Sequence, residues 1–128
     1  MGKLEGKVAI ITGGGKGIGF GLAKAFAKEG ANLTITGRTM SRLEAAKEKL
    51  EAEYGVKVLP ITADGADEAS VANVVKQTVE TFGHIDTVVN NAQVSKSGVM
   101  LKDHTKEDFD LAIYSGLYAT FFYMRDAY

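Results

Sequence analysis

The fold is decided by the stretch VAIITGGGKGIG at residues 8–19, in which an apolar run passes directly into a glycine-rich turn. The run at residues 8–11 predicts a buried strand, and the amphipathic residues 18–29 predict a helix that ends at Gly30. A helix that begins at such a turn presents unpaired N–H groups and the positive end of its dipole. Because glycine also lets the backbone approach an anion closely, the stretch predicts a phosphate-binding βαβ unit rather than a flexible surface turn.

The rest of the chain repeats this alternation of strand and helix. Ser41 and Glu44 have the spacing of a capping box, and Thr105 and Asp108 have the same spacing. The apolar strands are near-continuous, as in a parallel sheet that is covered on both faces. We therefore predict one domain, residues 1–128, with a doubly wound parallel sheet in three α/β/α layers. The further predicted strands are residues 33–36, 56–61 and 85–89, and the further predicted helices are residues 41–54, residues 67–82 and a last helix that opens at Thr105.

Composition excludes several classes of function. The chain has 128 residues, 15 Lys and Arg against 16 Asp and Glu, a net charge of −1 and no cysteine. This charge argues against a nucleic-acid or anionic membrane partner, and the lack of cysteine excludes disulfides, a thiolate nucleophile and Cys-ligated metals. His84 and His104 lack metal-ligand spacing, so no metal site is expected. With no signal-like segment and no run of about 20 apolar residues, we expect a cytoplasmic protein.

The spacing of the glycines decides which anion the turn would hold. A P-loop requires Ser or Thr after its lysine, whereas Lys16 is followed by Gly17. The pattern G-x-G-x-x-G fails as well, because Ile18 and Phe20 stand where glycine is required. The pattern that fits is T-G-x-x-x-G-x-G, over residues 12–19.

This pattern resembles that of the short-chain dehydrogenase/reductase family, and a second motif supports the resemblance. Residues 90–93, Asn-Asn-Ala-Gln, are similar to the N-N-A-G motif that follows the fourth strand in that family. Residues 4–13, Asp64 and residues 82–86 also stand where the family has similar residues. The resemblance spans essentially the whole chain and implies a Rossmann-like sheet that is incomplete in this chain.

The resemblance also implies a dinucleotide site. The glycines of residues 13–19 would cradle the pyrophosphate, and Asp64 would accept a hydrogen bond from the adenine amino group. Asn90 and Ala92 would line the ribose on the nicotinamide side, while Thr12 would tie the glycine turn to the fourth strand. The cofactor-binding residues that we predict are Gly13, Gly15, Lys16, Gly17, Ile18, Gly19, Arg38, Asp64, Gly65, Asn90, Asn91 and Ala92.

Some of these residues have a purely structural alternative. In that case Asp64 would simply begin a turn with Gly65. Asn90 and Asn91 would simply satisfy backbone groups at a strand end. The presence of the other motifs favours the functional interpretation for Asp64 and Asn90.

The end of the second strand indicates which dinucleotide is bound. An NAD site places a carboxylate there to accept from the ribose hydroxyls, and that carboxylate repels a 2′-phosphate. Residues 36–39 are Thr-Gly-Arg-Thr and contain no acid. Arg38 can pair with a phosphate and stack on adenine, and Lys16 adds a second charge; the alternative is that both are solvated surface cations. The missing acid favours NADP(H).

The family's catalytic groups are not found in this chain. The family uses a tyrosine, a lysine four residues later, a serine, and an asparagine that supports a proton relay. A nearby cation is needed because tyrosine at its ordinary pKa of about 10 is too weak a base. None of the five tyrosines has lysine four residues later, and Gly116 stands where the family has the asparagine. We therefore expect a cofactor-binding half with no catalytic residue, inactive by itself.

Two departures from the family pattern point to a narrower resemblance. Gln93 replaces the last glycine of N-N-A-G, and Gly116 replaces the asparagine. Together with residues 114–125, they resemble a bacterial subgroup that includes 12α-hydroxysteroid dehydrogenases of bile acids. This resemblance implies a small alcohol or ketone substrate, with a hydroxysteroid as one candidate.

The last helix carries more apolar residues than one face needs. Tyr114, Tyr118 and Phe122 form a second apolar face, and in the family this helix takes part in a subunit interface, which implies a homo-oligomer. The first face is a stripe at i, i+4 spacing that predicts core packing: Phe109, Ile113, Leu117 and Phe121.

Two other interpretations compete with an NADP(H)-dependent oxidoreductase. A non-catalytic dinucleotide-binding or regulatory module would explain the absent catalytic groups. Such a module would leave the apolar strand 85–89 as an unpaired edge, so we expect self-association through that strand or the last helix. A purely structural interaction protein leaves the glycine turn and Arg38 unexplained.

Overall fold

Four parallel strands form the centre of the protein. The structure is a computed structural model that describes residues 2–92 and 98–128. The chain places two strands on one side of β1 and then crosses over to place β4 on the other side, so the order is β3-β2-β1-β4. The predicted doubly wound parallel sheet is confirmed. The strands are β1 (Val8–Thr12), β2 (Asn32–Gly37), β3 (Val58–Thr62) and β4 (Thr87–Val89).

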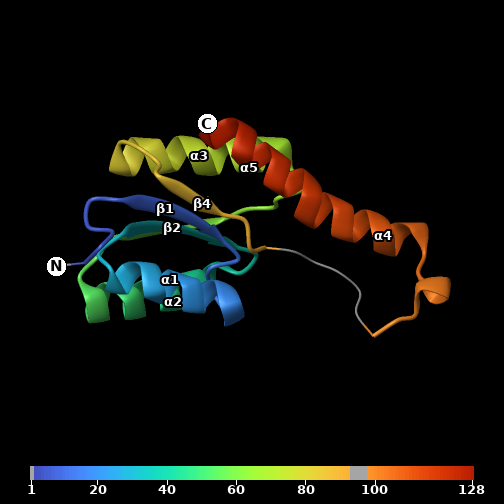
Figure 1. Cartoon of the computed structure of the whole chain (residues 1–128), viewed down its shortest axis with the longest axis horizontal. Coiled ribbons are helices and arrows are strands. Elements are labelled where there is room, and N and C mark those ends of the chain that lie inside the picture. The colour runs from blue at the N-terminus through green and yellow to red at the C-terminus, as the bar shows by residue number, and fades with distance from the viewer. Residues whose placement is uncertain (1, 93–97) are drawn as a thin grey trace.

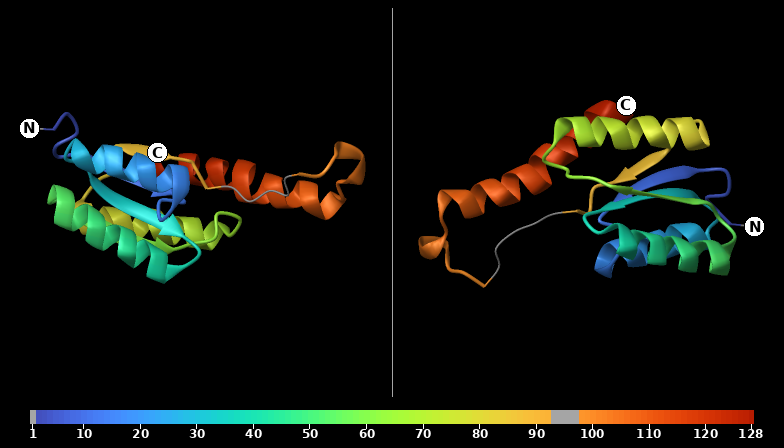
Figure 2. Two further views of the ribbon diagram at one scale, coloured as in Figure 1. Left: turned by 90° about the horizontal axis from the view of Figure 1, so that it is seen from below. Right: turned by 180° about the vertical axis from the view of Figure 1, so that it is seen from behind.

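Helices cover both faces of the sheet and complete the three predicted layers. Figure 1 shows α1 (Gly17–Lys28) and α2 (Met40–Tyr54) on one face, with α3 (Glu68–Phe82) and α5 (Ala119–Ala127) on the other. A further helix extends beyond the sheet, as both views in Figure 2 show. It is α4 (Lys106–Ala112), which follows the short 3-10 turn η1 (Leu101–Asp103) and passes through the π-helical segment η2 (Ile113–Tyr118) into α5.

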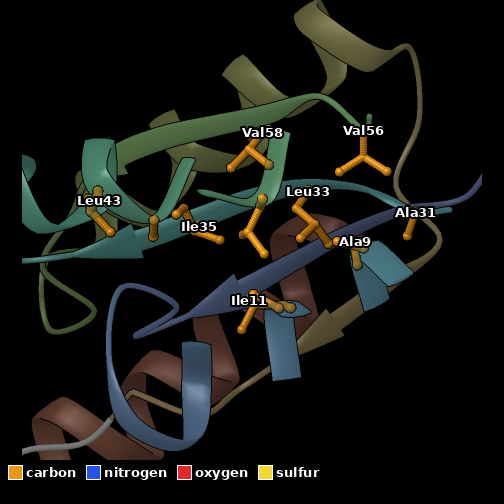
Figure 3. Packing of buried hydrophobic residues seen from close by; sticks show 12 residues of the cluster. Ala9, Ile11, Ala31, Leu33, Ile35, Leu43, Val56 and Val58 are labelled. Carbon is orange, nitrogen blue, oxygen red and sulfur yellow. The ribbon is translucent and has the colours of Figure 1, made fainter. Parts of the chain in front are cut away.

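The core lies on both sides of β1, and all five residues of that strand are buried. Because successive strand side chains point to opposite faces, Ala9 and Ile11 join the cluster under α1 and α2, while Ile10 joins the cluster under α3 and α5. Figure 3 shows Ile11 beside Leu33 and Ile35 of β2 in the first cluster. This burial on both faces explains why the sequence of the strand is a continuous run of apolar residues.

Several predicted helix ends are confirmed. Gly55 and Gly83 end α2 and α3 with φ angles of 71° and 90°, in the left-handed region that favours glycine. Thr105 caps α4, and its side chain and that of Asp108 form the predicted capping box. These ends depend on local chemistry, so the sequence was sufficient to place them.

Other predicted ends are wrong. Helix α2 begins at Met40 with Thr39 at the N-cap, so Ser41 lies inside the helix and forms no capping box. Strand β3 begins two residues later than predicted, because the Lys57 N–H donates to Asn32 Oδ1 at 2.9 Å rather than to a strand.

Strand β4 is also shorter than predicted and begins at Thr87. The N–H of Val8 donates to Asp86 Oδ2 at 2.8 Å, and the Asp86 N–H donates to the Val8 carbonyl at 2.8 Å. The Asp86 side chain thereby takes a position that a backbone carbonyl would have in a longer ladder.

The predicted core stripe of the last helix is wrong. Phe109, Leu117 and Phe121 are 64%, 65% and 54% exposed, whereas Ala119 and Tyr123 are buried. A π-helical segment changes the angular phase of the side chains that follow it, and α4 lies beyond the edge of the sheet (Figure 1). The residues that pack on the sheet are therefore offset from the predicted stripe.

We predict that Asp86→Asn lowers the melting temperature more at pH 7 than at about pH 3. The Val8 N–H, followed by His84 and Lys7, holds the pKa of Asp86 below its ordinary value, against the opposing effect of desolvation. A carboxylate with a lowered folded-state pKa stabilises the protein above its unfolded-state pKa, and this contribution is lost as the pH falls through the folded-state value. Thermal unfolding followed by circular dichroism measures both values.

The exposed Asp103 offers a matched control, and Asp103→Asn should leave both melting temperatures unchanged. An equal loss at both pH values for Asp86→Asn would contradict the role of the carboxylate charge.

Candidate cofactor site

A cavity of about 1090 Å³ opens where the parallel strands end. Thr12, Gly37 and Thr62 line it at the carboxyl ends of β1, β2 and β3, and Asn90 lines it just after β4. Open α/β sheets bind ligands at this edge, at the point where the strand order reverses. Here the reversal lies at β1, between β2 and β4.

The cavity brings together all of the residues predicted to bind a cofactor. They come from the turn after β1, the end of β2, the loop after β3 and the loop after β4. Their cofactor contacts stay a prediction, but their convergence is a property of the fold. The lining includes Gly13, Gly15, Lys16, Gly17, Ile18, Gly19, Arg38, Asp64, Gly65, Asn90, Asn91 and Ala92.

The Thr12 hydroxyl holds two of these segments against each other. Its oxygen accepts the N–H of Asn91 at 3.0 Å and the N–H of Ala92 at 2.9 Å, and the hydroxyl donates to the Val89 carbonyl at 3.3 Å. Only 4% of Thr12 is exposed. This side chain therefore holds the loop after β4 against the end of β1, together with the Asn91 amide, which donates to the Gly13 carbonyl at 3.5 Å.

The glycine turn leaves its backbone open toward the cavity. A Cβ on Gly19 would overlap the Gly13 carbonyl oxygen, so helix α1 can begin this close to the turn only with glycine there. Gly17 has a φ of 57° with nothing within 4 Å of where a Cβ would lie. Helix α1 has no acidic residue in its first turn, and its N-cap residue Lys16 makes no side-chain capping bond. These features fit an anionic group such as a pyrophosphate.

Asp64 has contacts compatible with both of its interpretations. Its Oδ1 accepts the Ala66 N–H at 2.9 Å, and its own N–H donates to Ser70 Oγ at 3.0 Å. The carboxylate therefore does form a local turn. Within the part of the chain that the structure describes, its Oδ2 accepts no hydrogen bond, so it has capacity for an adenine amino group. Gly65 beside it packs on Ala119, whose Cβ would lie 2.6 Å from a Cβ at Gly65.

The charge around the cavity is mostly positive. Lys16, Arg38 and Arg42 line it, and Asp64 is the one acid in its lining among residues 2–92 and 98–128. Arg42 was not among the predicted site residues, although its position four residues after Arg38 is visible in the sequence.

Tyr123 is a second lining residue that was not predicted from the sequence. It is 1% exposed. Burial raises the pKa of Tyr123 to about 12, while the side chain of Thr36 in β2 opposes this shift. A tyrosine with this pKa remains protonated at neutral pH, so it suits a supporting role rather than that of a base.

The two departures from the family motifs fall in different places. Gly116 lies in η2, and its carbonyl accepts a hydrogen bond of 2.8 Å from Thr120 Oγ1. Gln93 lies outside the described residues. Across residues 2–92 and 98–128, no three acidic or histidine side chains are grouped so that they could hold a metal, and no helix is long and apolar enough to span a membrane.

The fold and the site define a Rossmann-type nucleotide-binding protein. A model of the short chain dehydrogenases matches residues 7–128, and the chain therefore belongs to the short-chain dehydrogenase family, whose members are NAD(P)-dependent oxidoreductases. The resemblance inferred from the glycine turn and residues 90–93 is confirmed.

Individual relatives agree with this assignment. The chain is 56% identical to a 12α-hydroxysteroid dehydrogenase of a Clostridium species, in an alignment that covers 100% of this chain and 52% of that protein. A short chain dehydrogenase from Burkholderia cenocepacia, solved in complex with NADP, superposes with a TM-score of 0.90 at 36% identity, over 98% of this chain and 51% of that one.

The NAD⁺-bound structure of a xylitol dehydrogenase superposes with a TM-score of 0.91 at 28% identity, over 98% of this chain and 48% of that one. The chain thus spans about half the length of these relatives. Both cofactors occur among the related structures, so the fold alone does not select between them.

We predict that Thr12→Val weakens the site and the fold together. The substitution leaves two backbone N–H groups without their acceptor, at a cost of about 1–3 kcal/mol of unfolding free energy for each group that stays buried. Urea denaturation measures the loss of stability, and titration with NADPH measures the loss of affinity.

Thr12→Ser keeps the hydroxyl and is the control, with most of the stability and affinity retained. A valine variant as stable as the parent chain would contradict the proposed role of the hydroxyl.

Proposed function

We propose that this chain provides the NADP(H)-binding domain, residues 1–128, of an oxidoreductase that acts on an alcohol or ketone. When bound, the nicotinamide supplies the hydride chemistry. The residues of this chain bind and orient the dinucleotide, with the glycine turn at the pyrophosphate, Asp64 at the adenine and Asn90 with Ala92 at the second ribose. None of its five tyrosines has lysine four residues later, so we propose cofactor binding without turnover by these 128 residues.

The preference for NADP(H) is supported by the charges at the end of β2. Gly37 and Arg38 line the cavity there, where an NAD site would place a carboxylate. Lys16 lines the same cavity from the glycine turn. Two cations and no local acid favour a 2′-phosphate over a 2′-hydroxyl.

The substrate class is proposed from the relatives. The 56% identity to a 12α-hydroxysteroid dehydrogenase supports a hydroxysteroid as substrate of the whole enzyme. We further propose that the enzyme works in the cytoplasm as a homo-oligomer, without a nucleic-acid or membrane partner.

We predict that Arg38→Gln weakens NADPH binding by about tenfold or more, and NADH binding by less. The variant loses both a phosphate contact and a stacking partner for adenine, and only the second loss affects NADH. Isothermal titration with the two dinucleotides measures both affinities.

Lys24→Gln, on the exposed side of α1 and outside the cavity lining, is the control and should bind both dinucleotides as the parent chain does. Equal losses for NADPH and NADH in Arg38→Gln would contradict recognition of the 2′-phosphate.

The homo-oligomer is expected to use what we call the α4–α5 surface. Tyr114 and Tyr118 stack on it with ring centroids 4.9 Å apart. Large exposed apolar areas commonly mark interaction sites. The exposed residues of this surface are Phe109, Tyr114, Leu117, Tyr118, Phe121 and Met124.

We predict that the chain self-associates and that Leu117→Glu shifts it to the monomer. Leu117 is 65% exposed, so a charge there disturbs an interface without entering the core. Light scattering coupled to size-exclusion chromatography measures the mass of each form. Met100→Glu, at a residue 68% exposed outside this surface, is the matched control. A parent chain that stays monomeric would contradict the proposal.

A further inference from the structure

We propose that Arg42 is a specificity-determining residue that binds only the 2′-phosphate of the dinucleotide. This inference rests on the proposed NADP(H) function and goes beyond the motif residues. Arg42 lies in the first turn of α2, which begins at Met40, and its side chain belongs to a helix rather than to the loops that carry Lys16 and Arg38.

The packing of Leu43 brings together the three chain segments that carry these cations. Leu43 is 1% exposed and lies between two glycines. A Cβ on Gly15 would lie 3.1 Å from Leu43 Cδ2, and a Cβ on Gly37 would lie 3.2 Å from the same atom. Only small residues allow this close contact among the glycine turn, the end of β2 and the first turn of α2.

The cations are the immediate neighbours of these packed residues. Lys16 follows Gly15, Arg38 follows Gly37, and Arg42 precedes Leu43. All three cations line the cavity. The packing that buries Leu43 therefore brings together the backbone positions that carry the three charges.

The three cations are unpaired in the part of the chain that the structure describes. Within residues 2–92 and 98–128, none of the three makes an ion pair or a side-chain hydrogen bond. Helix α2 has no acidic residue in its first turn. Clustered like charges repel one another, and a phosphate monoester of charge about −2 would offset this repulsion.

A merely solvated arginine is the competing explanation, because Arg42 is exposed. The exposure of Arg42 is, by itself, compatible with a solvated side chain that binds nothing. The position of Arg42 in the cavity lining, beside two further unpaired cations, favours phosphate recognition instead. Guanidinium matches a phosphate through two parallel N–H bonds, whereas a 2′-hydroxyl offers no charge to pair with.

Arg38 and Arg42 therefore have distinguishable roles. Arg38 extends from the loop that follows β2 and can both stack on adenine and contact the phosphate. Arg42 contributes to the phosphate alone. Loss of Arg42 should reduce the affinity for phosphorylated ligands without changing the affinity for their unphosphorylated counterparts.

The test compares ligands that differ only in this phosphate. The parent chain, Arg42→Gln, Arg42→Lys and the control Lys49→Gln are each titrated with 2′,5′-ADP, 5′-AMP, NADPH and NADH. Lys49 is an exposed cation on the same helix that does not line the cavity. Circular dichroism verifies that each variant is folded.

We expect Arg42→Gln to weaken the binding of 2′,5′-ADP and NADPH by about tenfold. The affinities for 5′-AMP and NADH should change by less than about twofold. Arg42→Lys, which keeps the charge but not the forked geometry, should fall between the parent and the glutamine variant. The affinity of Arg42→Gln for 2′,5′-ADP should also depend less on salt than that of the parent.

Three results would overturn the inference. Unchanged 2′,5′-ADP binding in Arg42→Gln would reject the role of Arg42 but leave the proposed function intact, provided the parent still prefers NADPH. Equal losses for 2′,5′-ADP and 5′-AMP would show that Arg42 acts on the adenosine or on the fold. A parent chain that binds NADH as well as NADPH would reject the proposed cofactor and, with it, this inference.

Discussion

The geometry of the site depends on the hydrogen bonds of the Thr12 hydroxyl. Thr12 ends β1, the strand that pairs with β2 on one side and β4 on the other. Its oxygen accepts the N–H groups of Asn91 and Ala92 and so holds the loop after β4 beside the start of the glycine turn. Ala92 lies 80 residues after Thr12 in the chain. The Thr12 hydroxyl, the pairing of β1 with β4 and the Asn91 amide, which donates to the Gly13 carbonyl at 3.5 Å, together hold the two segments beside each other at the cavity.

Around this contact, the strand order determines where the cavity lies and the residues at the strand ends determine what it can bind. The reversal of direction at β1 opens the crevice, as in other doubly wound sheets. The glycine turn lines that crevice, and the end of β2 contributes Gly37 and Arg38 rather than an acid. The related structures contain NADP or NAD⁺ on the same fold, so the preference must come from such side chains.

The sequence correctly predicted structural features that depend on neighbouring residues. It did not predict features that depend on residues distant in the chain. Gly55 and Gly83 end helices because of their own left-handed backbone, and both were predicted. The start of β4 depends on the contact of Asp86 with Val8, 78 residues away, and was not. Tyr123 was missed for a similar reason, because it reaches the cavity from a helix whose facing residues are decided by tertiary packing.

Tyr123 also shows why a tyrosine in a cofactor cavity is not thereby an acid or a base. Burial raises the pKa of Tyr123 to about 12, so its hydroxyl stays protonated at neutral pH. Tyr123 packs in the cluster under α3 and α5 and acts on Thr36, whereas Leu43 packs in the cluster under α1 and α2 and lies against Gly37. The two residues that precede Arg38 are therefore packed from both faces of the sheet.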